Sequence, residues 1–251
     1  MIEVIRDGRL LRITLNRPEK RNALSLDLCR QLVTAFEAAD SDTSVGAILL
    51  NGNGKCFCAG MDLSEMAVVD SEALSDLHEK LFTLGARMTK PIVAAVHGAA
   101  LGGGTGLAAN AHILVAAPDA SFGLTEIRIG LWPFLIFRSV ALAVGERRAT
   151  ELALTGRTFL GAEACQLGLV HHVAEDPQKS ALHVAEIVAN SSATAIARGL
   201  ELVREMRGKS WEECGQIARR TRETALNSED FAEGVDAFLN KRTPIWPSLR
   251  V

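Results

Sequence analysis

The sequence has little net charge. It contains 27 Lys and Arg against 30 Asp and Glu, which gives a formal net charge of −3. Because the two signs are interspersed, the chain lacks the basic surface that attracts nucleic acids or anionic membranes. We therefore expect a small molecule as its partner, and neither a nucleic acid nor a membrane.

The cysteines lack a disulfide or metal-binding pattern. They are odd in number and scattered: Cys29, Cys56, Cys58, Cys165 and Cys214. Such usage is typical of reduced thiols in a cytoplasmic protein, which is the location we expect. The Cys56-x-Cys58 spacing is a weak metal signal compared with true zinc motifs, so we expect no metal ion.

No apolar run is long and uninterrupted enough for a membrane helix. The longest apolar region, residues 91–118, is broken by glycines, His97, Asn110 and His112. This region instead predicts a strand, a Gly-rich turn, a short helix and a second strand. Residues 1–7 alternate apolar and polar side chains, which predicts a first strand rather than the apolar core of a signal peptide.

Periodicity predicts an α/β core. Two alternating segments flank Asp7-Gly8, a strong hairpin signal, and residues 26–39 carry apolar side chains at helical spacing. The predicted strands are 2–6, 10–16, 45–50, a strand from 92, and 112–116, and the predicted helices are 26–39 and 72–87. Strands alternating with helices predict mainly parallel pairing, and 251 residues can bury a substantial core.

The last part of the chain is different in character. It has helical periodicity and almost no strand signal, over 178–191, 193–207, 211–226 and 230–240. Apolar faces on such helices need another surface to cover them, and a neighbouring subunit is one solution. We therefore expect a core over residues 1–192 and a helical oligomerisation region over 193–251.

Two Gly-containing turns indicate chemistry. Residues 98–106 (GAALGGGTG) follow the apolar run 92–96, and glycines at a strand-to-helix junction let a ligand approach free backbone N–H groups. If the amides of Met61 and Gly103 converge, they form an oxyanion hole, in which one donor is typically worth about 3–4 kcal/mol of transition-state stabilisation. The alternative is an ordinary pair of tight turns.

Five segments in order resemble the enoyl-CoA hydratase/isomerase (crotonase) superfamily. They are 13–25 (ITLNRPEKRNALS), 57–63 (FCAGMDL), 96–104 (VHGAALGGG), 154–157 (LTGR) and 168–170 (GLV). The resemblance implies a spiral of ββα units with a C-terminal helical trimerisation region, assembled as trimers or dimers of trimers. It also implies an acyl-CoA substrate, with coenzyme A as part of that substrate and no prosthetic group.

The resemblance also implies site residues. Met61 and Gly103 would supply the two oxyanion-hole amides, and coenzyme A would contact Lys20, Arg21, Ala23, Cys58, Ala59, Gly60, Asp62, Phe238 and Lys241. For Lys241 a solvated surface charge is an equal alternative. Asp62 and Glu65 have the spacing of a capping box, which predicts a short helix that begins near Asp62.

The acids depart from the hydratase pattern. Hydratases of the superfamily use two glutamates, at the positions of Gly106 and Glu126, and share between them the work of activating water and moving a proton. Only Glu126 is present here. One carboxylate suffices to move a proton from C2 to C4 of a 3-enoyl-CoA, so the pattern favours a Δ3-Δ2-enoyl-CoA isomerase. Neighbouring apolar residues would raise the pKa of Glu126.

Three alternatives remain open at this point. They are a 2-enoyl-CoA hydratase with a second acid from a distant segment, another reaction on the scaffold such as decarboxylation, and a non-catalytic acyl-CoA binder. Residues 130–137 (GLWPFLIF) replace the Gly-rich turn of typical hydratases. We expect Gly106, Trp132, Pro133 and Phe134 to line a dry acyl pocket, with core packing as the alternative role of this stretch.

Overall fold

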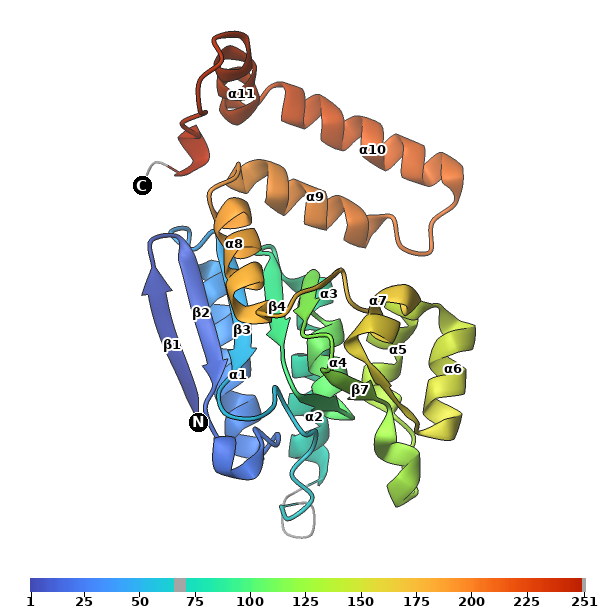
Figure 1. Ribbon diagram of the computed structural model, residues 1–251. Helices are drawn as coiled ribbons and strands as arrows, with labels where there is room; N and C mark the ends of the chain where they lie inside the picture. The colour runs from blue at the N-terminus through green and yellow to red at the C-terminus, as the bar shows by residue number, and fades with distance from the viewer. Residues whose placement is uncertain (66–70, 250–251) are drawn as a thin grey trace.

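Apolar, β-branched runs build a six-stranded sheet in the computed structural model, which describes residues 1–65 and 71–249 (Figure 1). In sheet order the strands are β1 (Ile2–Asp7), β2 (Leu10–Leu15), β3 (Ala47–Gly52), β4 (Ile92–Val96), β6 (Ile113–Ala116) and β9 (His172–Val173). β1 and β2 form the expected antiparallel hairpin, and every later neighbour pairs in parallel. The α/β expectation is confirmed.

A second, three-stranded sheet holds the Gly-rich turn. It consists of β5 (Ala99–Leu101), β7 (Ser121–Gly123) and β8 (Thr158–Leu160), in the order β5-β7-β8. A bridge between Cys58 and Ala100 ties the loop after β3 to the outer side of β5. The segments that the sequence singled out for chemistry therefore lie next to one another.

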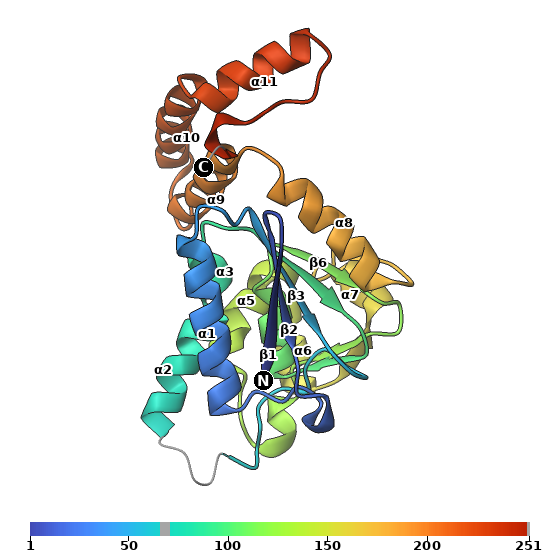
Figure 2. The ribbon, with the colours of Figure 1, turned by 90° about the vertical axis from the view of Figure 1, so that its left-hand side faces the viewer.

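Helices cover both faces of the large sheet (Figure 2). α1 (Leu26–Ser41) packs on one face through the buried stripe Leu28, Leu32 and Phe36, and its N-cap Ser25 accepts a hydrogen bond from the Leu28 amide. α8 (Pro177–Ala189) packs on the other face through Ala181, Ala185 and Ala189. The small alanine side chains let this helix lie close to the strands.

The body of the molecule contains eight further helical segments among the described residues. They are η1 (Pro18–Lys20), α2 (Ser71–Phe82), α3 (Leu84–Arg87), α4 (Gly103–Ala109), η2 (Thr125–Ile129), α5 (Phe134–Val144), α6 (Glu146–Thr155) and α7 (Gly161–Leu167). The predicted helix over 72–87 is two helices, because Thr83 takes non-helical dihedral angles between α2 and α3. At Gly85 a methyl carbon would lie 1.9 Å from the Asn110 carbonyl oxygen, so the break brings two backbones into contact.

The last helices form an arm at one end of the molecule (Figures 1 and 2). They are α9 (Ala193–Glu205), α10 (Trp211–Leu226) and α11 (Glu229–Leu239), followed by η3 (Pro247–Leu249). α9 and α10 bury none of their residues, and α11 buries only Asp230 and Ala237. Within residues 1–65 and 71–249, no helix is long and apolar enough to cross a membrane.

Candidate active site

The backbone on both sides of Met61 is hydrogen-bonded to Leu24, just before the start of α1. The Leu24 amide donates to the Gly60 carbonyl at 2.8 Å, and the Asp62 amide donates to the Leu24 carbonyl at 3.1 Å. Gly60 has a φ of +97°, and a methyl carbon on it would lie 2.6 Å from the Leu101 carbonyl oxygen. A glycine is therefore required here, and the turn leaves the amide of Met61 outside the hydrogen bonds to Leu24.

The amides of Met61 and Gly103 lie close together. A methyl carbon placed on Gly103 would lie 3.8 Å from the Met61 nitrogen, and one placed on Gly60 would lie 3.5 Å from the Gly103 nitrogen. Gly103 is the first residue of α4, where an amide has no partner within the helix. Neither amide donates a hydrogen bond within the described part of the chain. The two donors can therefore meet one substrate oxygen.

Glu126 brings its carboxyl group to the same turn. It lies in η2, and its Oε1 atom is 3.1 Å from the position of a methyl carbon on Gly102. Its Oε2 atom is buried and has no hydrogen-bond partner among the described residues. Burial raises the pKa of Glu126 above its ordinary value. The side chain is therefore suited to accept a proton and to release it again.

The position of Gly106 has no room for a second acid. A methyl carbon there would lie 2.1 Å from Cγ2 and 2.5 Å from Cβ of Ile136, a buried residue of α5. Any larger side chain would have to displace Ile136. Sequence reasoning noted the missing glutamate at this position, and the structure adds that an isoleucine fills the adjacent space.

The bulky stretch 130–137 does not form one wall. Trp132 is half-buried against Phe137, with ring centroids 5.8 Å apart, and Pro133 is buried. Phe134 is 72% exposed. Trp132 belongs to the apolar packing around the main core, whereas Phe134 lies on the surface of the single chain, so its assignment to the acyl pocket stays a prediction.

A cleft of about 490 Å³ lies beside β5 and the loop after β3. It is lined by Pro18, Arg21, Gly54, Lys55, Cys56, Ala59, Ala99 and Leu101. Arg21 and Ala59 are among the residues expected to bind coenzyme A, and Lys55 is a second cation that sequence reasoning did not assign. Lys20 is exposed on η1, next to Arg21. The cleft is therefore lined by two cationic side chains together with apolar residues of β5 and of the turn after β3.

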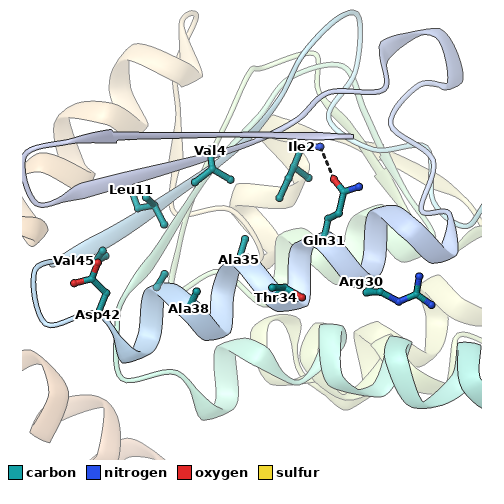
Figure 3. A pocket seen from close by; sticks show the side chains of 11 residues that line it. Ile2, Val4, Leu11, Arg30, Gln31, Thr34, Ala35, Ala38, Asp42 and Val45 are labelled. Atoms are coloured by element: carbon teal, nitrogen blue, oxygen red, sulfur yellow. Dashed lines mark hydrogen bonds between the residues drawn. The ribbon is translucent and has the colours of Figure 1, made fainter.

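Another groove, of about 520 Å³, lies between the β1–β2 hairpin and α1 (Figure 3). It is lined mainly by aliphatic side chains, including Val4, Leu11 and Ala35. Gln31 accepts a hydrogen bond from the Ile2 amide at its edge. Because the groove lacks a convergent set of acids, bases or free amides, it offers no counterpart to the arrangement around Glu126.

Asp62 has a different role from the one its spacing predicts. Residues 63–65 form a turn, and the rest of the predicted short helix falls on residues 66–70, outside the described part of the chain. Asp62 forms an ion pair with Arg17 at 2.6 Å and accepts from the Ser64 amide and hydroxyl, and these hydrogen bonds keep its pKa below the ordinary value. Glu65 accepts from the Leu26 amide at the start of α1. The capping-box prediction is therefore wrong, because each acid caps or pairs elsewhere.

Phe238 and Lys241 lie apart from the cleft within one chain. Phe238, on α11, is 82% exposed, and Lys241 follows that helix on the surface. α11 and α2 lie at opposite ends of the molecule in both views (Figures 1 and 2), and α2 contacts α4. In residues 1–65 and 71–249, no group of three or more His, Cys, Asp or Glu side chains is placed to hold a metal ion.

Nearly the whole chain matches one family of known proteins. The model of the enoyl-CoA hydratase/isomerase family matches residues 6–248. The chain belongs to the enoyl-CoA hydratase/isomerase family. The 2,3-dehydroadipyl-CoA hydratase of Escherichia coli (strain K12) is 38% identical over 246 residues, which is 96% of each chain. The family assignment makes this protein an acyl-CoA enzyme.

Solved structures of family members share the fold. The enoyl-CoA hydratase of Mycobacterium smegmatis superposes with a TM-score of 0.91 at 32% identity, over 98% of each chain. The enoyl-CoA hydratase of Bacillus anthracis has a TM-score of 0.91 at 30% identity, over 98% of this chain and 99% of that one. The crotonase-like fold is thus confirmed. These relatives are named as hydratases, and none of the three is named as an isomerase.

Proposed function

We propose that this protein isomerises a 3-enoyl-CoA to the 2-enoyl-CoA, with Glu126 as the single carboxylate that moves the proton. The observation that carries the proposal is the packing of Ile136 against Gly106, which leaves no space for a second acid at position 106. Hydration requires a water that is held and activated while a proton is delivered, and two carboxylates share that work. Proton transfer between two carbons of one substrate needs only one.

The steps follow from the geometry. The substrate carbonyl oxygen would accept hydrogen bonds from the amides of Met61 and Gly103, which lie side by side. Glu126 would remove a proton from C2, and the electrons would move into a dienolate whose negative oxygen those amides stabilise. Glu126 would then return the proton at C4, with the remaining double bond between C2 and C3. Its raised pKa makes the carboxylate a stronger base for the first of these two steps.

We place coenzyme A along the cleft between η1 and the loop after β3. Arg21 and Lys55 offer two cations for its phosphates, and Lys20, Ala23, Cys58 and Gly60 flank the same turns. Asp62 is then a positioning residue, because its carboxylate is already engaged by Arg17 and Ser64. Replacement of Arg21 and Lys55 with Met should weaken coenzyme A binding, as measured by calorimetry, and leave the fold unchanged.

A hydratase is the second candidate, and the names of the relatives favour it. In this chain a hydratase would need an acid that takes the place of the missing glutamate at Gly106. A 3-hydroxyacyl-CoA product that carries oxygen from labelled water would support this candidate.

Two substrates separate the candidates. The purified protein is mixed with a 3-enoyl-CoA and, separately, with a 2-enoyl-CoA, and the ultraviolet absorbance of the conjugated thioester is followed. Isomerisation predicts a rise with the 3-enoyl substrate and no change with the 2-enoyl substrate. A fall with the 2-enoyl substrate would overturn the isomerase proposal in favour of hydration, and tight binding without turnover of either would indicate a binder.

We further propose that residues 1–192 form the catalytic core and residues 193–251 an oligomerisation region of a homotrimer or a dimer of trimers. The support is the exposed apolar surface of the arm, which includes Trp211 at 93% and Phe238 at 82% exposed. Phe238 and Lys241 would reach coenzyme A only in a second copy of the chain. Light scattering of the full chain tests the assembly.

The five unpaired cysteines favour a cytoplasmic location.

A further inference from the structure

His78 is an unsatisfied polar side chain on an otherwise apolar stripe. The buried positions of α2 are Leu74, His78, Leu81 and Phe82. His78 is only 7% exposed, and its Nε2 atom is buried without a hydrogen-bond partner within the described part of the chain. A buried polar group without a partner typically destabilises a fold by about 1–3 kcal/mol, so its presence calls for a physical reason.

Two other histidines of the body, His112 and His171, have structural partners at Nδ1, and His97 bonds through Nε2 to the Gly54 carbonyl while its buried Nδ1 has no partner among the described residues. His112 Nδ1 accepts from the Ile92 amide at 3.0 Å, and His171 Nδ1 accepts from the Leu114 amide at 3.0 Å. Both rings therefore complete the hydrogen bonding of strand ends. His78 makes no such bond, and its described ring contact is with Phe82, at 5.6 Å between centroids.

Phe82 connects His78 to the reacting end of the substrate. Its Cζ atom lies 3.3 Å from the position of a methyl carbon on Gly103, so a single aromatic ring separates the imidazole from the oxyanion hole. Leu74, one turn before His78, is buried without belonging to either apolar core cluster of the described residues. Leu77, on the same half of α2, packs against the main core, so this part of the helix lies at the edge of that core.

Burial lowers the pKa of His78, which favours the neutral imidazole. A neutral imidazole carries one N–H donor and one acceptor nitrogen. Since Nε2 has no hydrogen-bond partner among the described residues, an oxygen of a bound ligand can take that place. An acyl chain that starts at the amides of Met61 and Gly103 and passes Phe82 would bring its later carbons to this atom.

We infer that His78 selects acyl-CoA thioesters whose acyl chain carries an oxygen beyond the reacting carbons, and that Nε2–H donates a hydrogen bond to that oxygen. This inference rests on the proposed acyl-CoA site and extends it to the class of acyl group. A purely aliphatic chain would leave Nε2 unpaired in the complex. An oxygen-bearing chain would satisfy it.

Binding of saturated thioesters tests the inference without any turnover. Isothermal calorimetry on the full protein compares three matched pairs that differ only in a terminal methyl or carboxylate: butyryl- and succinyl-CoA, hexanoyl- and adipoyl-CoA, and octanoyl- and suberoyl-CoA. We expect the carboxylate to bind about tenfold more tightly at one chain length, because one hydrogen bond to a charged acceptor is worth roughly that factor. The ω-hydroxyhexanoyl thioester shows whether a neutral oxygen suffices.

Variants assign the preference to the imidazole. His78→Leu and His78→Phe should remove the preference, and His78→Gln, which keeps an N–H donor, should restore part of it. His183→Leu, at an exposed histidine of α8, is the matched control and should change nothing. Wild-type protein that binds the methyl-ended partner equally well at every length, or a preference that survives in His78→Leu or His78→Phe, would overturn the inference. Because binding alone is measured, neither outcome depends on whether the protein isomerises or hydrates its substrate.

Discussion

The body and the arm of this molecule use similar helices for opposite purposes. α1, in the body, buries Leu28, Leu32, Val33 and Phe36 against the sheet. α9 and α10, in the arm, have comparable apolar spacing and bury no residue. The comparison teaches that periodicity predicts a helix and its apolar face, whereas the surface that covers the face depends on the rest of the chain or on another copy of it.

The largest expected difference in unfolding free energy between the body and the arm comes from replacing one glycine in each. In the body, Gly104→Ala would place a methyl carbon 2.2 Å from the Cys58 carbonyl oxygen, and we expect a loss of about 4 kcal/mol or more in unfolding free energy. In the arm, Gly215 on α10 has no atom within 4 Å of that position, so Gly215→Ala should stabilise the helix by up to about 1 kcal/mol. Urea denaturation of both variants measures the contrast. Destabilisation by Gly215→Ala would show that another subunit packs closely on this face.

Two arginine ion pairs sharpen the comparison. Arg17 pairs with Asp62 at 14% and 7% side-chain exposure, beside the Met61 amide. Arg17→Met should destabilise the body by about 3 kcal/mol, because a buried carboxylate is left unpaired, and should lower kcat. Arg242 pairs with Glu233 and Asp236 at the exposed end of the arm, and Arg242→Met should change stability by about 1 kcal/mol or less. Equal effects of the two variants on the melting temperature would contradict this assignment.

A smaller effect is expected where the arm folds on itself. Asp230 is buried and accepts hydrogen bonds from Ser192, Thr194 and Ser248, which joins α9, α11 and η3. Asp230→Ala should loosen the arm by about 2 kcal/mol, since these hydroxyls lose their acceptor. Limited proteolysis should then cut near residue 192 faster than in the wild type. Asp236→Ala, at an exposed acid of the same helix, is the control and should leave the rate of cleavage at that point unchanged.

The smallest effect concerns the pH dependence of stability. The pKa of Glu126 is raised in the folded protein, so its ionisation opposes folding above that pKa, and the penalty disappears below the unfolded-state pKa. Glu126→Gln should therefore melt slightly higher than the wild type at neutral pH and equally at acidic pH. Wild-type activity should fall with decreasing pH at a value above the ordinary pKa of a glutamate. A variant that melts lower at neutral pH would contradict this sign.

Much of the fold could be predicted from local patterns. The hairpin at Asp7-Gly8, the helix over α1 and the succession of strand, turn, short helix and strand after Pro91 were all expected from alternation, spacing and glycines. The short strands β5 and β7 to β9 and the helices α5 to α7 were not predicted, because their formation depends on tertiary contacts. The break at Thr83 was missed because it depends on the contact of Gly85 with Asn110.

Some features of the candidate site could also be predicted from local motifs, and others depend on tertiary contacts. The proximity of the Met61 and Gly103 amides to Glu126 was expected from the motifs, because glycines with restricted conformations leave a clear sequence pattern; their catalytic roles stay a proposal. The ion pair of Arg17, the packing of Ile136 against Gly106 and the unpartnered Nε2 of His78 could not be predicted, since each depends on segments far away in the sequence. Asp62 shows the limit most clearly, because its spacing to Glu65 fits a capping box while both side chains bond to other segments.

The most direct test of the account is the turnover of one 3-enoyl-CoA by the wild-type protein and by Glu126→Gln, measured side by side with their affinities for the thioester. The account predicts that the wild type forms the conjugated 2-enoyl product and that the variant loses at least about 10²-fold in kcat. Affinity should be nearly unchanged, because the amides of Met61 and Gly103 remain in place. Retained activity in Glu126→Gln, or a 3-hydroxyacyl product from the wild type, would contradict the claim that one carboxylate performs the reaction.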